Sequence, residues 1–193
     1  MNLSERVKGI LLKPKQEWQT ISKETTTIQE LYKTYVVILA AIGPVAWIIG
    51  MSLVGIRIPA VGSFRVPIFT SISSAIVNFV LTLVGVYVLA LIIDGLAPRF
   101  SGQKSLNQAF KVAAYSHTPG WVVGVVGIIP SLSPLMILGL YGLYLLYLGL
   151  PVLMETPKEK SLGYTIAVII AAIVILMVIG FISRAFISYP TLG

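Results

Sequence analysis

The chain has 193 residues, of which 56% are hydrophobic and only 11% are charged, and its formal net charge is +7. A soluble globular domain carries roughly a quarter charged residues, so this composition excludes an ordinary soluble protein and indicates an integral membrane protein. The absence of cysteine excludes disulfides and thiolate metal sites, and the basic residues flank apolar runs instead of forming a soluble patch, so no nucleic-acid partner is expected.

Residues 1–27 are too polar to cross a membrane and are patterned as two short helices. Asn2 lies three residues before Glu5, which is a helix start signal, and Lys13-Pro14 ends the first helix because proline disfavours helical geometry in the residue before it. An apolar face carries the residues expected to turn inward: Leu3, Val7, Leu11 and Trp18. The pattern predicts an amphipathic cytoplasmic segment, either an interfacial anchor near anionic headgroups or a helical cap packed on the bundle.

Residues 28–193 are expected to form an all-α domain, a bundle of five transmembrane helices. A hydrocarbon core of about 30 Å requires about 20 helical residues. Five apolar runs have that length: Tyr35–Ile56, Phe69–Ile93, Ala109–Ile129, Pro134–Met154 and Gly163–Ile187. Gly43-Pro44 predicts a kink in the first. Two capping pairs predict helix starts at Ile28 and near Leu106: Thr27 with Glu30, and Ser105 with Gln108.

The distribution of basic residues predicts the orientation of the bundle. Eleven Lys and Arg residues lie in the N-terminal segment, the second connection and the fourth connection, whereas three lie on the other side: Arg57, Arg65 and Arg184. We therefore expect the N-terminus in the cytoplasm and the C-terminus outside.

Polar side chains within the expected spans are the candidate functional residues. Counting 1.5 Å per residue from the helix ends places Asn78, His117, Tyr141 and Tyr144 near the middle of the bilayer. Polar groups at this depth need partners, and they mark solute or ion pathways by default. The four residues are therefore a candidate polar layer, which is either sealed or hydrated.

No catalytic, cofactor-binding or metal-binding residue is predicted. A zinc site needs three or four ligands, which one histidine without cysteine does not supply from the usual set, and no acidic residue lies near His117 to support a serine nucleophile. A non-enzymatic membrane organiser or partner-binding protein needs only packed helices, a basic tail and a lipid-facing helix. The alternative is a small-solute or ion transporter or channel, although no charged residue lies deep in a span. The lipid bilayer is the expected partner, and a homo-oligomer or a membrane-protein partner is left open.

Several residues also resemble a known family. The second connection and the third span contain, at loose spacing, Gly102, Leu106, Phe110, Ala114, Tyr115 and Pro119. This run resembles the loop-and-helix signature of prokaryotic Yip1-domain proteins, with Gly102, Phe110, Tyr115 and Pro119 as the family-like motif. Pro14 with Trp18 is similar to their N-terminal segment. The run 147–150, followed by Lys160, is similar to the end of their fourth helix.

The resemblance covers essentially the whole chain and implies five membrane helices in a prokaryotic inner membrane. Eukaryotic relatives are implicated in early secretory-pathway traffic and in contacts with small GTPases. Their longer N-terminal region and their Asp-Leu-Tyr-Gly-Pro motif are absent from this sequence. The resemblance therefore supplies no trafficking role, biochemical activity or cofactor.

Overall fold

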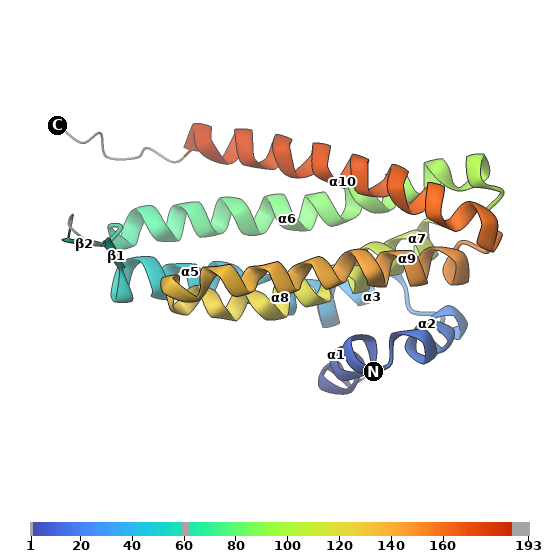
Figure 1. Ribbon diagram of the computed structural model, residues 1–193, viewed down its shortest axis with the longest axis horizontal. Coiled ribbons are helices and arrows are strands. Elements are labelled where there is room, and N and C mark those ends of the chain that lie inside the picture. Colours follow the sequence, from blue (N-terminus) through green and yellow to red (C-terminus); the bar gives the residue numbers. More distant parts are fainter. Residues whose placement is uncertain (1, 59–61, 187–193) are drawn as a thin grey trace.

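The computed structural model describes residues 2–58 and 62–186, and most of these residues are helical (Figure 1). The elements up to residue 96 are α1 (Leu3–Leu12), α2 (Pro14–Lys23), α3 (Ile28–Leu31), a π-helical turn (Tyr32–Val36), α4 (Val37–Ala40), α5 (Ile42–Ile48), a second π-helical turn (Ile49–Val54), β1 (Ile56–Ile58), β2 (Gly62–Phe64) and α6 (Ile68–Leu96). The later elements are a 3-10 turn (Ala97–Phe100), α7 (Leu106–Ser116), α8 (Thr118–Val123), two 3-10 segments (Gly124–Ile128 and Pro130–Leu140), α9 (Tyr141–Leu153) and α10 (Lys158–Phe186). Ile187 and the C-terminus, which enter the predictions of the last span and of the orientation, lie outside the described residues.

Side-chain caps set the starts of three helices. Asn2, Thr27 and Ser105 each accept a hydrogen bond from a backbone amide two or three residues further on. Such caps satisfy amides that have no partner inside the helix. The helix starts predicted at Ile28 and Leu106 are therefore confirmed.

Among the described residues, four helical stretches are long and apolar enough to cross a membrane: Ile28–Val54, Ile68–Phe100, Pro130–Leu153 and Lys158–Val178. An all-α membrane protein is therefore confirmed. The run expected as a further span, Ala109–Ile129, is not one continuous helix, because it is divided into α7, α8 and a 3-10 segment with a break at His117. Pro119 follows this break and has no amide hydrogen for the helical ladder. Pro44 has the same effect on the first span, which is interrupted at Ala41.

The long helices lie roughly parallel to one another (Figure 1). Helices α6 and α10 run side by side on one side of the bundle, and α5, α8 and α9 form the other side. The hairpin of α1 and α2 lies against this second side, toward the end of the bundle that contains α7. The short strands β1 and β2 lie at the opposite end, where Ile56 pairs with Phe64 and Arg57 with Ser63.

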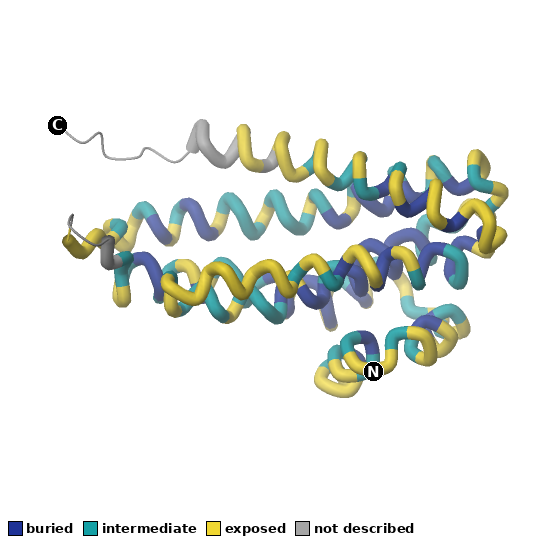
Figure 2. Tube along the Cα trace, in the orientation of Figure 1, coloured by how far each residue is buried: buried dark blue, intermediate teal, exposed yellow. Residues whose placement is uncertain are grey.

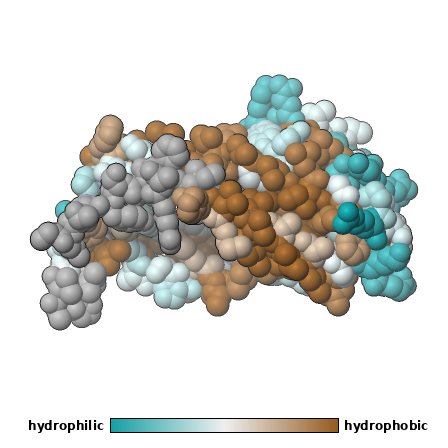
Figure 3. Space-filling model, turned by 90° about the horizontal axis from the view of Figure 1, so that it is seen from above, coloured by the Kyte–Doolittle hydropathy of each residue, from teal (hydrophilic) through white to brown (hydrophobic). Residues whose placement is uncertain are grey.

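Burial is uneven along the bundle (Figure 2). The half that contains α7 is densely packed, and every residue from Ala109 to Ser116 is buried. Toward the β1–β2 end, large apolar side chains are exposed on α6, on the second 3-10 segment and on α10, for example Phe69, Ile137 and Leu176. Figure 3 shows this apolar surface over the middle of the molecule, with hydrophilic residues gathered at one end. An apolar belt of this kind suits contact with lipid.

Glycines allow the first span to approach the 3-10 segment that follows α8. A Cβ atom added to Gly50 would lie 1.9 Å from the carbonyl oxygen of Gly127. A Cβ atom added to Gly124 would lie 3.1 Å from the Cα atom of Gly43. Small residues permit close backbone approach between membrane helices, where van der Waals packing is a main source of association. These glycines therefore fix the crossing between the two segments.

Candidate functional site

The hairpin of α1 and α2, residues 3–23, packs on α8 and α9 (Figure 1). Its two helices end and begin at Leu12 and Pro14, as the Lys13-Pro14 pair predicts. Its inner face includes the four residues expected to turn inward. Trp18 is fully buried, and three others are partly buried against the core: Leu3, Val7 and Leu11. Ile10 and Ile21 are also fully buried, so the hairpin contributes to the core of the bundle.

Arg6 holds the two helices of the hairpin together from inside. Its guanidinium donates through Nη1 to Oε1 of Glu17 and through Nη2 to Oε1 of Glu24. Arg6 is only 6% exposed, and its guanidinium carbon lies 5.6 Å from the ring centroid of Tyr115 in α7. A planar guanidinium is suited to this combination, because its fork serves two carboxylates while its face rests on an aromatic ring. Arg6 therefore links α1, the α2 region and the bundle.

Lys111 provides a second buried cation, from the bundle side. Its Nζ atom donates to the carbonyl oxygens of Ile21 and Glu24, at 3.3 and 2.5 Å. These carbonyls lie at the C-terminal end of α2, where the helix dipole and the unpaired carbonyls favour a cation. Asn107 and Gln108 add hydrogen bonds to the carbonyls of Thr26 and Ser22, at 3.0 and 3.3 Å. The first turns of α7 therefore bind the end of α2 and its following linker through backbone atoms.

Aromatic packing completes this contact. Trp18 lies directly over Gly149 of α9, where an added Cβ atom would come within 2.7 Å of the indole ring. The Trp18 and Tyr115 rings meet edge to face at 6.1 Å, and the Tyr35 and Tyr115 rings at 4.8 Å. The hydroxyls of Tyr35 and Thr118 are hydrogen-bonded at 2.7 Å. We name the set of Arg6, Glu17, Glu24, Lys111, Trp18 and Tyr115 the hairpin dock.

The family-like motif residues lie in and around the dock. Phe110 is fully buried, with its ring 4.8 Å from that of Tyr32, and Pro119 is buried at the start of α8. Tyr115 belongs to the dock itself. Gly102 allows the loop before α7 to approach the end of α9, because an added Cβ atom would lie 2.8 Å from the carbonyl oxygen of Met154. The motif residues therefore lie within α7 or in the segments directly before and after it, where packing is dense.

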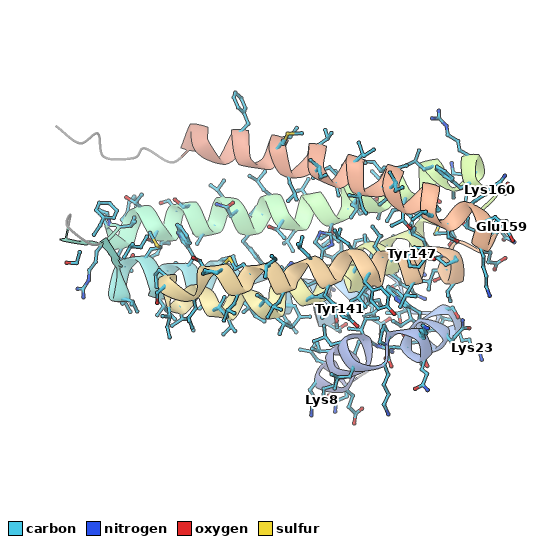
Figure 4. All side chains as sticks on the ribbon, viewed as in Figure 1. Lys8, Lys23, Tyr141, Tyr147, Glu159 and Lys160 are labelled. Atoms are coloured by element: carbon cyan, nitrogen blue, oxygen red, sulfur yellow. The ribbon has the colours of Figure 1, made fainter. Side chains whose placement is uncertain are left out.

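The four residues of the candidate polar layer have individual partners. Asn78 donates to the carbonyl of Ser74, at 2.9 Å, and Nδ1 of His117 lies 2.7 Å from the carbonyl oxygen of Ala113, each one turn earlier in its own helical stretch. The structure brings Tyr141 and Tyr144 together, with ring centroids 5.5 Å apart. The Tyr141 hydroxyl donates to the carbonyl of Leu11 in the hairpin, at 3.1 Å, and Tyr144 is exposed; Figure 4 shows Tyr141 on the side of α9 where the hairpin lies.

A polar cavity of about 690 Å³ opens between the hairpin and the start of the first span. It is lined by Asn2, Glu5, Arg6, Glu17, Lys23, Glu24, Thr25, Thr26, Glu30 and Thr34. Within the part of the chain that the structure describes, no group of three or more His, Asp or Glu side chains is placed to hold a metal ion. The polar and charged side chains of the described residues in the dock and the cavity thus gather around the hairpin.

Sequence analysis did not identify Arg6, Glu17, Glu24 and Lys111 as a cluster. A signal for Arg6 exists, because it lies three residues after Leu3 and four before Ile10, on the otherwise apolar face of α1. A signal for Lys111 also exists, because it falls within an expected membrane span. In the sequence alone, both residues contribute only to the positive charge that predicts the orientation.

Comparison with known proteins identifies the family that the motif residues Gly102, Phe110, Tyr115 and Pro119 resemble. The family model described as the Yip1 domain matches residues 8–179. Two curated relatives, both named inner membrane protein YohC, come from Escherichia coli K12 and from Escherichia coli O6:H1. Each is 28% identical to this chain over 175 residues, which cover 89% of this chain and 90% of the relative. No solved structure matches the chain. Because the family model covers most of the sequence, the chain belongs to the Yip1 domain family.

Proposed function

We propose that this protein is a non-enzymatic organiser of the inner membrane, or a binder of another membrane protein, and that it presents the docked hairpin on the cytoplasmic side. The membrane location is supported by the apolar helices and by the relatives, which are named inner membrane proteins. Neither the description of the matching family nor the names of the relatives state a catalytic activity. In this proposal, residues 1–27 form the cap and residues 28–193 form the bundle.

We further propose five crossings, with the third beginning in α7 and continuing through α8 and the 3-10 segment after it. This topology is supported by α7 and α8 running in one direction and by the Pro130–Leu153 stretch returning beside them. The excess of Lys and Arg at the α7 end supports a cytoplasmic N-terminus.

The main support for the proposed function is the position of the buried charged side chains. Among the described residues, the buried charged side chains are Arg6 and Lys111. Both hold the hairpin on the bundle, near one end of the molecule. A coupled transport pathway would instead place ionisable groups along a route through the middle of the membrane. The buried polar chemistry of this chain therefore supports presentation of a cytoplasmic element more than conduction.

The orientation is tested with single cysteines, because the chain has none of its own. Glu159→Cys, at the end of the bundle that carries α7, should react with an impermeant maleimide only after the inner side of the membrane is opened (Figure 4). Ser63→Cys, which is exposed in β2, should react in intact spheroplasts. Ser63 is chosen over Gly62, whose φ of +109° disfavours a side chain. The reverse labelling pattern would refute the orientation.

Flux measurements distinguish the organiser from a transporter. Vesicles containing the purified protein should pass protons, potassium ions and glycerol no faster than protein-free vesicles, and His117→Gln should not change these rates. The physical reason is that His117 is bonded to a backbone carbonyl and stacked on Trp121, at 5.6 Å. A flux that requires His117, in a variant with unchanged thermal unfolding, would replace the organiser proposal by transport through the candidate polar layer.

A further inference from the structure

The hairpin directs two of its acidic residues inward and exposes its lysines, together with Glu5, on the outside. Glu17 and Glu24 are turned toward Arg6 and are neutralised by it. Lys8, Lys13 and Lys15 are exposed on the outside. In the sequence, these acidic residues dilute the positive charge of the N-terminal segment. In the folded hairpin, Lys13 and Lys15 are exposed at the turn, and Lys8 lies one turn before it with exposed Glu5 three residues further back, so the outer surface keeps a net positive charge.

The turn of the hairpin also exposes one large apolar side chain. Leu12 is 77% exposed, although its neighbour Leu11 packs against the core. Leu12 lies beside Lys13, one helical turn after Lys8, and three residues before Lys15 across the break between the two helices. An exposed leucine surrounded by lysines is typical of segments that insert an apolar side chain among lipids while cations remain at the headgroups. We call Lys8, Leu12, Lys13 and Lys15 the hairpin tip.

The position of the tip along the bundle is set by contacts with α9. Leu11 is bonded to Tyr141 at the start of α9, whereas Trp18 lies on Gly149. These two α9 residues are about 12 Å apart along the helix, so α2 runs from the tip toward the end of the bundle that carries Lys160. Figure 4 shows Lys8 near the level of Tyr141, and Lys23 nearer to Glu159 and Lys160.

We place the edge of the hydrocarbon layer near the same level. Gly142 backs onto the carbonyl of Ser116, and the neighbouring Thr118 is bonded to Tyr35, so these residues and Tyr141 share one layer. From Tyr35, the first span has 20 residues to its end at Val54, or about 30 Å, which matches the thickness of a hydrocarbon core. With this placement, the tip lies near the region where that core meets the headgroups.

We propose that the hairpin tip binds anionic phospholipid headgroups of the adjacent leaflet. Leu12 enters the boundary between headgroups and acyl chains, and Lys8, Lys13 and Lys15 contact lipid phosphates. Each lysine near an anionic surface should change the ratio of bound to free tip by roughly fivefold, the equivalent of about 1 kcal/mol. The inference rests on the proposed membrane function in one respect, since it requires the bundle to lie in a bilayer.

The test uses Leu12→Cys labelled with the environment-sensitive dye NBD, in nanodiscs that hold one copy of the protein. Nanodiscs expose both faces of the bilayer, so the result does not depend on which face is cytoplasmic. Replacing phosphatidylcholine by a mixture with phosphatidylglycerol should shift the NBD emission to the blue and reduce its quenching by iodide. High salt should reverse both changes, because it screens charges at an aqueous interface.

Two matched variants locate the effect. Lys13→Gln should weaken the response to phosphatidylglycerol by roughly fivefold, and the triple change Lys8→Gln, Lys13→Gln and Lys15→Gln should abolish it. Lys23→Gln removes the same charge from the far end of the exposed hairpin and should leave the response intact. Equal losses in Lys13→Gln and Lys23→Gln, or identical spectra in both lipids, would overturn the proposal. A label that is shielded in both lipids would show apolar insertion without headgroup recognition, which also overturns it.

Discussion

Replacing Gly50 with alanine is expected to cause a large loss of bundle stability, because no side chain fits at this position. The added Cβ atom would lie 1.9 Å from the backbone oxygen of Gly127, which belongs to a helical segment and does not rotate away. Overpacking a dense interior typically costs about 1–3 kcal/mol, and a clash with backbone places this variant near the upper end, at about 3 kcal/mol. Unfolding by sodium dodecyl sulfate in mixed micelles, followed by circular dichroism, measures the change.

Gly95→Ala provides the control for this experiment. Gly95 lies in α6 with no atom within 4 Å of an added Cβ, so the substitution should be neutral or stabilise the helix by roughly 0.5–1 kcal/mol. A comparable loss of stability in both variants would show that glycine matters for helix flexibility and not for the contact between Gly50 and Gly127.

Replacing Arg6 with alanine is expected to release the hairpin while the membrane helices stay folded. The change leaves Glu17 and Glu24 without their common partner, close to each other and partly shielded from water. Breaking a fully buried pair costs about 3–5 kcal/mol and breaking an exposed pair less than about 1 kcal/mol. The two carboxylate side chains are 20% and 27% exposed, so we expect about 2 kcal/mol, between these limits.

Hydrogen exchange of residues 3–23 measures this release, because amides of a docked helix exchange when it opens. A loss of about 2 kcal/mol corresponds to exchange roughly 30-fold faster, with residues of α6 and α10 unaffected. Arg6→Lys keeps the charge but not the two-pronged geometry, and it should give an intermediate rate. Lys8→Ala, an exposed change in the same helix, should leave the rate in detergent unchanged. Equal exchange in the Arg6→Ala and Lys8→Ala variants would contradict the role assigned to Arg6.

Local signals in the sequence were sufficient to predict much of the fold. The caps at Thr27 and Ser105 and the break at Lys13-Pro14 depend on residues within one turn, and the structure confirms them. Each apolar run likewise predicts a membrane-spanning segment by its own composition, because lipid excludes charged side chains from each run separately. The interruption at His117 was harder to predict, since the position of Pro119 indicates a break but not the arrangement of the segments on either side of it.

The hairpin dock could not be derived from the sequence in the same way. The contact of Lys111 with Glu24 joins residues 87 positions apart, and either residue alone is typical of an aqueous flank. Residue counting also assumes that a helix begins at the membrane surface. Tyr141 begins α9, but it contacts the hairpin, and a depth counted from the preceding loop takes no account of this contact. Such pairings become visible only when the packing of distant segments is known.

The contact between the hairpin and α9 has a consequence for the order in which the protein is assembled. The carbonyl of Leu11 and the hydroxyl of Tyr141 are 130 residues apart, so Leu11 is synthesised well before its partner. At roughly 5–20 residues per second, the hairpin waits on the order of ten seconds for α9 to be synthesised. During that interval Trp18 lacks its contact with Gly149, and only the parts of the docking surface that belong to α7 and α8 are present on the nascent chain. Complete docking therefore follows the synthesis of α9, and a ribosome stalled before that point would leave an incompletely docked hairpin that chaperones and proteases can recognise.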